Sequence, residues 1–436
     1  MELCVLGIFV LGLIACVALH VSILWALGAG LALFCGYACL RGHSLAAVAA
    51  MLRDGMLTIK NIVIILGMVG LLTAVWRTGG TIPYIIVHTL TWIDPAQFAL
   101  WMFLLCAGMS FLLGSAFATV TTLGVILMIL ARTAGLDEAL AAGAIMGGIY
   151  VGDRTSPASS CASLVSALTQ TNLYDNILAM LKSASLPFLL ACGAYALLGI
   201  QHPAHTVDIS VTHSIREAFA LPHWTLAPAL IILALSLLRV DVKISMLLSI
   251  LSGIFLSITV QGMTWKALLE ALFWGFHPSS PLLFLDGGGF FSMAKVLGVL
   301  LISSGFAGIF GKTALLSPFR GMVTRTVRAC GRFCSTAIFS LPISALACNQ
   351  TLAVILAVQV CGGAYRRKQE LALHLADSVV LIAALIPWSI ACVVPLTTLG
   401  AQGDALYYAF FLYFIPVFHC IYAIIMHYRK KFHNYA

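Results

Sequence analysis

Long apolar runs, separated by short polar stretches, recur from one end of the 436-residue chain to the other. A run of about 18 residues or more can cross the roughly 30 Å of membrane hydrocarbon as an α-helix. Some of the runs are too long or too broken for one simple helix. The pattern therefore predicts an all-α polytopic membrane protein with about 10 to 13 transmembrane or re-entrant helices.

The composition agrees with this pattern. Hydrophobic residues make up 61% of the chain, charged residues make up 9%, and the mean hydropathy is +1.06, whereas soluble domains carry about 25% charged residues. This excludes an ordinary soluble domain. The first apolar run has no basic segment before it and no small-residue cleavage site, so we expect a retained helix and not a signal peptide.

The net charge of +8 is distributed in a way that indicates topology. Basic residues gather in three places: Arg41, Arg53 and Lys60; then Lys312, Arg320, Arg325, Arg328 and Arg332; then the final "YRKKFH". Cytoplasmic segments of membrane proteins are enriched in lysine and arginine. We therefore expect these regions and both termini to be cytoplasmic in a multi-pass protein of the cell membrane. The lipid bilayer is the expected partner, and nucleic acid is not.

Two halves of the chain resemble each other. "GMVGLLTAVWRTGGTIPYIIV" from residue 67 resembles "GVLLISSGFAGIFGKTALLSPF" from residue 298, and "ATVTTLGVILMI" at 118–129 resembles "CNQTLAVILAVQ" at 348–359. The same spacing pairs Asp153 with Asp377. The segment 312–332 holds five basic residues, and its counterpart 77–97 holds one, which predicts that the two lie on opposite sides of the membrane. Inverted repeats with broken helices are the usual design of secondary transporters.

These observations divide the chain into six segments. We expect N-terminal transmembrane helices over 1–56, a first repeat with a broken-helix site over 57–200, an external linker over 201–224, connecting helices over 225–297, a second repeat over 298–395, and a C-terminal helix with a basic tail over 396–436. The linker contains His202, His205 and His213. A zinc site is conceivable there, but the simpler expectation is a polar connection. The thirteen scattered cysteines contain no C-x-x-C pair, and we expect no cofactor.

The stretch "GGIYVGDRTSPASS" at 147–160 places Asp153 and Arg154 in an apolar setting. An ionised side chain in hydrocarbon costs a few kcal/mol or more, so it needs a partner, water or a ligand. Pro157 disfavours helix at Ser156, and the nearby glycines permit unusual backbone geometry. A break here frees carbonyl groups beside the hydroxyl oxygens of Thr155, Ser156, Ser159 and Ser160. Hard cations take such oxygen ligands, so we expect a cation or proton site; an Asp–Arg pair that caps a helix end is the alternative.

The run "GAIMGGIYVGDRTSPASSCASLVSALTQTNLYDNI" closely resembles the signature region of the NhaC-type sodium/proton antiporter family. The likeness extends through "WRTGGTIPYII", "GSAFATVTTLGVILM", "GGGFFSM", "NQTLAVIL" and "LADSVVLIAALIPW". It implies Na⁺ and H⁺ as transported ions or, in relatives, exchange of small organic acids such as malate and lactate. The candidate residues for binding Na⁺ or H⁺ are Asp153, Ser156, Ser160, Thr119, Thr122, Asn349, Gln350 and Asp377, and Arg154 is a candidate substrate or charge partner.

The chain departs from the family pattern at several positions. Ser160 stands where relatives commonly have a second acidic residue, Ser163 where they have asparagine, Cys348-Asn349-Gln350 where they have Gly-Asp-Gln, and Ala376 where they have an acid. Fewer carboxylates indicate a weaker or differently tuned cation site.

Three functions remain open at this point. The first is a sodium/proton antiporter, and the second is an exchanger of small organic anions in which Arg154 binds the substrate carboxylate. The third is an intramembrane hydrolase. It is disfavoured because the chain has no G-x-S-x-G motif, and because neither Asp153 nor Asp377 lies in an aspartyl-protease context; we therefore expect no enzyme. The sequence leaves the oligomeric state open, a homodimer included.

Overall fold

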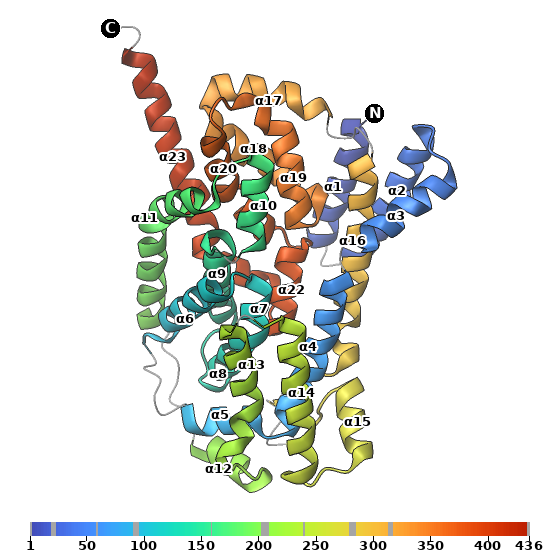
Figure 1. The fold of residues 1–436 in the computed structure, drawn as a ribbon, viewed down its shortest axis with the longest axis vertical. Helices are drawn as coiled ribbons and strands as arrows, with labels where there is room; N and C mark the ends of the chain where they lie inside the picture. Colours follow the sequence, from blue (N-terminus) through green and yellow to red (C-terminus); the bar gives the residue numbers. More distant parts are fainter. Residues whose placement is uncertain are drawn as a thin grey trace.

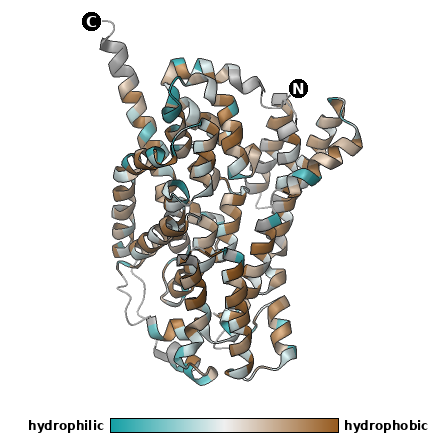
Figure 2. Ribbon diagram, in the orientation of Figure 1, coloured by the Kyte–Doolittle hydropathy of each residue, from teal (hydrophilic) through white to brown (hydrophobic). Residues whose placement is uncertain are grey.

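The computed structural model describes residues 2–18, 23–57, 60–89, 96–157, 159–201, 209–238, 240–278, 285–312 and 317–433. Within these ranges the regular structure is helical, apart from an isolated bridge between Phe276 and Gly287. This confirms the predicted all-α fold. Figure 1 shows an elongated bundle, and Figure 2 shows that hydrophobic residues predominate along its helices.

The N-terminal part contains α1 (Glu2–Ala18), α2 (Ile23–Leu40) and α3 (Leu45–Leu57). It is followed by α4 (Lys60–Thr78), α5 (Thr81–Thr89), α6 (Phe98–Leu113), α7 (Ala116–Thr119), the π-helix η2 (Val120–Gly124), α8 (Val125–Thr133), α9 (Glu138–Thr155) and α10 (Ser160–Thr169). The middle of the chain forms α11 (Leu173–Gln201), α12 (Ile209–Ala218), the 3₁₀-helix η3 (His223–Leu226), α13 (Ala227–Leu237), α14 (Val242–Thr259), α15 (Trp265–Trp274) and the 3₁₀-helix η5 (Phe290–Met293).

The last part contains α16 (Ala294–Lys312), α17 (Ser317–Cys330), α18 (Arg332–Ala347), α19 (Gln350–Cys361), η6 (Gly362–Ala364), α20 (Lys368–Asp377), α21 (Val379–Leu385), α22 (Ile390–Leu399), η7 (Gly403–Tyr408) and α23 (Phe410–His433). The predicted linker at 201–224 therefore includes the helix α12. His202 and His205 of the conceivable zinc site lie outside the described residues. Among the residues described, no group of three or more His, Cys, Asp or Glu side chains is arranged to hold a metal.

Several helices are suited to cross a membrane by length and composition. In the described ranges, Ala116–Thr133 and Leu173–Gln201 each qualify alone. Two further pairs qualify together but are bent: Val63–Thr78 with Thr81–His88 by 63°, and Lys368–Leu385 with Ile390–Leu399 by 52°. Bent or interrupted helices of this kind are expected of a transporter fold.

The helices of the two predicted repeats correspond in order and in length. Both α4 and α16 have 19 residues, both α6 and α18 have 16, and both α10 and α22 have 10. Helix α9 has 18 residues, and α20 and α21 together span the 18 positions 368–385. In Figure 1, α5 follows α4 at the lower end of the molecule, whereas α17 follows α16 at the upper end. The two halves therefore run in opposite directions along the long axis.

The helix ends repeat in conformation as well as in position. Gly114 (φ 68°) and Cys348 (φ 54°) both end a helix in the left-handed region, and each is followed by an extended N-cap, Ser115 (φ −149°, ψ 123°) or Asn349 (φ −146°, ψ 130°). Likewise Ser159 and Ser389 both cap the next helix at φ −72°. These shared breaks identify the equivalent positions of the two halves.

This register corrects the pairing expected from the sequence. Because Ser160 begins α10 and Ile390 begins α22, the position equivalent to Asp153 is Ala383, and the position equivalent to Asp377 is Gly147. Asn349 is equivalent to Ser115 and not to Thr119. The two aspartates are therefore not related by the repeat, and the carboxylate of Asp153 has no counterpart in the second half.

Small residues allow α6 and α9 to pack closely. A Cβ atom added to Gly152 would lie 2.0 Å from the carbonyl carbon of Ser110, and one added to Gly148 would lie 2.6 Å from the Phe103 carbonyl oxygen. Small residues bring helix backbones together in this way in membrane proteins. Both glycines lie inside the continuous helix α9, so their role is close packing. The break expected near these glycines lies after them, at Ser156.

Candidate functional site

The site is built around the end of α9. This helix stops at Thr155, and Ser156 is extended (φ −79°, ψ 140°), as expected for a residue that precedes proline. The chain resumes as α10 at Ser160. Asp153 therefore lies in the last turn before the predicted break, and its side chain is buried with 7% exposure.

Gln350 is the polar side chain that reaches the Asp153 carboxylate from the other half of the chain. Its Nε2 donates to Asp153 Oδ2 over 3.2 Å and to the carbonyl oxygen of Val380 over 3.0 Å. The backbone N–H of Ala116 also donates to the Asp153 carboxylate. The carboxylate thus receives one donor from each of the two repeats.

Two helices begin beside this carboxylate at equivalent breaks. Ala116 is the first residue of α7, which continues through η2 and α8 to Thr133, and Gln350 is the first residue of α19. The Ser115 hydroxyl accepts from the N–H of Ala118 over 3.3 Å, and Asn349 Oδ1 accepts from the N–H of Thr351 over 2.9 Å. Helix N-termini carry partial positive charge and stabilise a nearby anion. Asn349 therefore acts here as a helix cap.

The threonine candidates lie in the first two turns of the helix that begins at Ala116, and they bond within that helix. Thr119 Oγ1 donates to the Ser115 carbonyl oxygen over 2.9 Å, and Thr122 Oγ1 donates to the Ala118 carbonyl oxygen over 2.7 Å. Both side chains are buried, and their oxygen lone pairs remain available as acceptors. The π-helix at Val120–Gly124 interrupts the regular α-helix directly after Thr119, a feature that is frequent at functional sites.

The serines around the break have different roles. Ser159 is buried, donates to the backbone carbonyl oxygen of Asp153, and accepts from the N–H groups of Cys161 and Ala162 at 3.1 Å each. Ser156 is buried within the break, whereas Ser160 is exposed at the start of α10. Ser159 therefore fixes the geometry of the break, a role that the sequence assigned to no single serine.

Arg154 points away from Asp153 and pairs with Asp377. Its guanidinium donates to Asp377 Oδ1, to Ser183 Oγ over 2.7 Å, to the Met180 carbonyl oxygen over 3.1 Å and to the Ala376 carbonyl oxygen over 3.2 Å. The side chain of Arg154 is 0% exposed and that of Asp377 is 1% exposed. Buried charges are stable when they are paired and hydrogen-bonded in this way.

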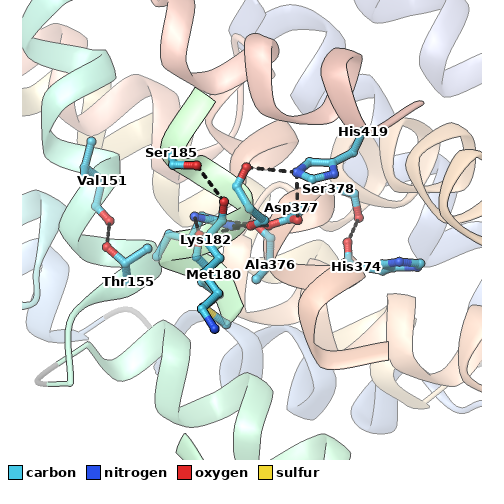
Figure 3. Close-up of polar contacts among 12 residues, drawn as sticks. Val151, Thr155, Met180, Lys182, Ser185, His374, Ala376, Asp377, Ser378 and His419 are labelled. Atoms are coloured by element: carbon cyan, nitrogen blue, oxygen red, sulfur yellow. Dashed lines mark hydrogen bonds and ion pairs between the residues drawn. The ribbon is translucent and has the colours of Figure 1, made fainter. Parts of the chain in front are cut away.

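His419 of α23 completes this second cluster. Figure 3 shows its imidazole facing Asp377, with Nε2 3.4 Å from Asp377 Oδ2. The same Nε2 lies 3.2 Å from the Ser183 carbonyl oxygen. These contacts differ from two expectations. Among the residues described, Asp377 contacts Arg154 and His419 and not Asp153. Arg154 pairs with Asp377 and not with Asp153, and its donors are taken by protein acceptors. Nothing in the sequence indicated Ser183 or His419.

The chemistry available at Asp153 follows from its surroundings. The carboxylate has donors from Gln350 and Ala116, and within the described part of the chain it forms no ion pair with a basic side chain. Carboxylate, hydroxyl and carbonyl oxygens surround the break, and such oxygens are the ligands of hard cations. A single carboxylate there can hold a cation or a proton.

Comparison with known proteins decides the family. A family described as the Na⁺/H⁺ antiporter family matches residues 148–429, which include Asp153, Gln350 and Asp377. The chain belongs to the Na⁺/H⁺ antiporter family. This confirms the resemblance seen in the sequence, and it makes the chain a membrane transport protein.

Individual proteins are also similar to this chain over most of its length. The Na⁺/H⁺ antiporter NhaC of Alkalihalophilus pseudofirmus is 28% identical over 379 residues, which cover 83% of this chain and 81% of the relative. The malate-2H⁺/Na⁺-lactate antiporter of Bacillus subtilis is 26% identical over 345 residues, which cover 75% of this chain and 73% of the relative. The arginine/ornithine antiporter ArcD of Halobacterium salinarum is 25% identical over 305 residues, which cover 67% of this chain and 63% of the relative. Proteins similar to this chain are thus named for different substrates.

Proposed function

We propose that this protein is a sodium/proton antiporter, in which Asp153 binds Na⁺ and H⁺ alternately. The observation that carries the proposal is the buried Asp153 carboxylate, which lies at a helix break and receives donors from Gln350 and Ala116 at the starts of two further broken helices. One carboxylate that holds either ion, but not both, makes the movement of Na⁺ depend on the movement of H⁺ in the opposite direction.

The remaining ligands of Na⁺ come from neutral oxygens near this carboxylate. We assign this role to the Thr119 and Thr122 hydroxyl oxygens and to the groups of the Ser156–Ser159 break, with Gln350 as the side chain that orients Asp153. Asn349 contributes by capping α19, and its Oδ1 is engaged with the Thr351 amide. Ser160, which is exposed, and Asp377, which is paired with Arg154, are not included among these ligands.

The relatives support the choice of ions. The NhaC protein of Alkalihalophilus pseudofirmus and its namesake in Bacillus subtilis are both named as Na⁺/H⁺ antiporters, and each covers more than 80% of this chain. The hypothesis of an organic-anion exchanger required Arg154 to bind the substrate. Because Arg154 is buried and surrounded by four protein acceptors, the structure gives no support to an exchanger in which Arg154 binds the substrate.

We place the protein in the cell membrane with both termini in the cytoplasm. Helix α17 lies at the upper end of the molecule in Figure 1 and carries the exposed Arg325 and Arg328. Basic segments are retained on the cytoplasmic side. Helices α5 and α12 at the lower end then face outward.

Reconstitution of the purified protein tests this function. Proteoliposomes that contain a pH-sensitive dye in their lumen are given a pulse of NaCl, and the same pulse is given as KCl and as choline chloride. We expect the luminal pH to rise with Na⁺ only, as protons leave in exchange. A response that is equal for all three salts, or absent for Na⁺, would refute the proposal.

A further inference from the structure

An apolar cavity lies between α6, α9 and α11, and the proposed ion exchange does not use it. It has a volume of about 440 Å³, which is the size of a pocket for a small molecule. Val151 and Thr155 of α9 belong to its lining. Residues four apart share one face of a helix, so Asp153, two positions from each, lies on the opposite face of α9. The cavity is therefore separate from the proposed ion site.

The side chains that line the cavity offer no free hydrogen-bond donor. Thr155 and Ser185 are the two polar residues of the lining, and Figure 3 shows that each bonds within its own helix. Thr155 Oγ1 donates to the Val151 carbonyl oxygen over 2.6 Å, and Ser185 Oγ donates to the Lys182 carbonyl oxygen over 2.9 Å. The other lining side chains are apolar. The occupant that suits such a wall is hydrocarbon.

The cavity opens on an apolar surface of the molecule. Phe111 and Leu181 belong to its lining and remain 37% and 41% exposed. The exposed side chains beside them on α6 and α11 are also large and apolar, among them Trp101, Leu105, Leu178 and Leu189. A large exposed apolar surface on a membrane transport protein marks contact with the membrane. An acyl chain can therefore enter the cavity directly from the bilayer.

Lys182 places a positive charge beside the cavity. It is exposed on the turn of α11 that supplies Leu181 and Ser185 to the lining, and within the described part of the chain its ammonium group forms no ion pair. Helix α11 runs downward from the upper half of the molecule in Figure 1, so Lys182, in its first half, lies toward the end that carries the basic helix α17. A lysine stem can follow an apolar surface while its head stays in water, and lysines near a membrane surface attract anionic lipids.

We propose that this cavity binds an acyl chain of an anionic phospholipid whose headgroup phosphate pairs with Lys182. The apolar wall accepts the chain, and the ammonium group without an acidic partner favours a negatively charged headgroup. Both features are adjacent on α11, so one lipid molecule can engage both. The bound chain contacts Val151 and Thr155 and thus packs against the back of the helix that carries Asp153.

Photolabelling of the full-length protein in phosphatidylcholine vesicles tests the proposal. A trace of phosphatidylglycerol or of phosphatidylcholine, each with a diazirine in its acyl chain, is added, and the labelled peptides are identified by mass spectrometry after illumination. Helix α14, with the exposed Leu247, Leu251 and Phe255, reports contact with ordinary bilayer lipid. Relative to α14, we expect the phosphatidylglycerol probe to label α6 and α11 about fivefold more than the phosphatidylcholine probe, because one headgroup charge pairs with Lys182.

Matched variants test the two parts of the site. Gly108 lines the cavity, and a Cβ atom added there meets no atom within 4 Å, so Gly108→Phe should fill the cavity and abolish the excess labelling. Gly193→Phe, at an equally open position of α11 outside the lining, should preserve it. Lys182→Gln should make the two probes label α6 and α11 equally, whereas Lys266→Gln, at an exposed position of α15, should not.

Two results would overturn the proposal. One is labelling of α6 and α11 that is equal for the two probes or no stronger than that of α14. The other is a preference for phosphatidylglycerol that survives Lys182→Gln. The melting temperature in detergent identifies a Gly108→Phe variant that is unfolded, and Lys182→Gln, at an exposed position, then decides. Because labelling reports lipid contact and not ion flux, its failure would leave sodium/proton exchange untouched.

Discussion

Gln350 donates a 3.2 Å hydrogen bond to Asp153 although 197 residues separate them along the chain. The bond joins the first turn of α19 to the last turn of α9. Each residue lies at a break in the helical structure, and each comes from a different repeat. The proposed ion site is therefore assembled from both halves, although only one half supplies the carboxylate.

Replacement of Asp153 tests its central role. Asp153→Asn should reduce sodium-dependent proton flux in proteoliposomes to the level of empty liposomes, because an amide neither ionises nor carries a proton. Asp137→Asn is the matched control, since Asp137 caps α9 through Leu140 N–H at 2.8 Å and asparagine caps equally well. Normal flux in Asp153→Asn would show that another group exchanges the ions.

Gln350 should set the affinity for sodium. Gln350→Leu removes a donor to Asp153, so the carboxylate loses its orientation, and we expect the sodium concentration for half-maximal flux to rise by about tenfold. Thr351→Val, at the exposed neighbouring position, should have little effect. An unchanged sodium dependence in Gln350→Leu would remove this residue from the site.

Asp377 should matter for stability more than for ion binding. Asp377→Asn leaves Arg154 as a buried unpaired charge, and breaking such a pair costs about 3 to 5 kcal/mol. Glu370→Gln is the control, because the Arg332–Glu370 pair is partly exposed (37% and 30%) and such pairs contribute about 0 to 1 kcal/mol. Thermal unfolding in detergent measures the loss of stability in each of the two variants. Asp377→Asn with the melting temperature of the wild type but altered sodium dependence would contradict this assignment.

Close packing of α6 on α9 can be tested with one added methyl group. Gly152→Ala places a Cβ atom 2.0 Å from the Ser110 carbonyl carbon, so we expect a loss of about 1 to 3 kcal/mol of stability. Gly193→Ala lies in α11 with no atom within 4 Å of the added Cβ, and helix propensity should make it neutral or slightly stabilising. Equal melting temperatures for the two variants would show that the helices can separate freely.

The orientation in the membrane can be tested by cysteine labelling. In a cysteine-free background, Arg325→Cys of α17 and Glu217→Cys of α12 both introduce an exposed thiol. With intact cells, an impermeant maleimide should label position 217 and should label position 325 only after the cells are opened. The reverse result would invert the proposed topology.

The sequence predicted the helical fold and the break at Ser156 because both have local causes. Apolar runs of sufficient length form helices in a membrane, and Pro157 excludes helix at the residue before it. The same local reasoning found Asp153 and Gln350, since polar side chains are conspicuous in apolar runs.

Tertiary contacts were beyond such reasoning. Arg154 follows Asp153 directly, yet successive helical residues point in different directions, and only the folded structure brings Asp377 and His419 to Arg154. The repeat register was misplaced by a few residues because apolar segments resemble one another at several alignments. The conformations of Gly114 and Cys348, which fix the register, leave no distinct signal in the sequence.

The buried ion pair between Arg154 and Asp377 also restricts how the protein can move. Arg154 belongs to the first repeat and Asp377 to the second, and four hydrogen bonds hold the guanidinium in place. Separating the two side chains during each transport cycle would expose both charges to hydrocarbon, at a cost of several kcal/mol. We therefore expect helices α9 and α20 to move together during transport. On this expectation, a boundary between moving and stationary helices cuts across both repeats instead of running between them.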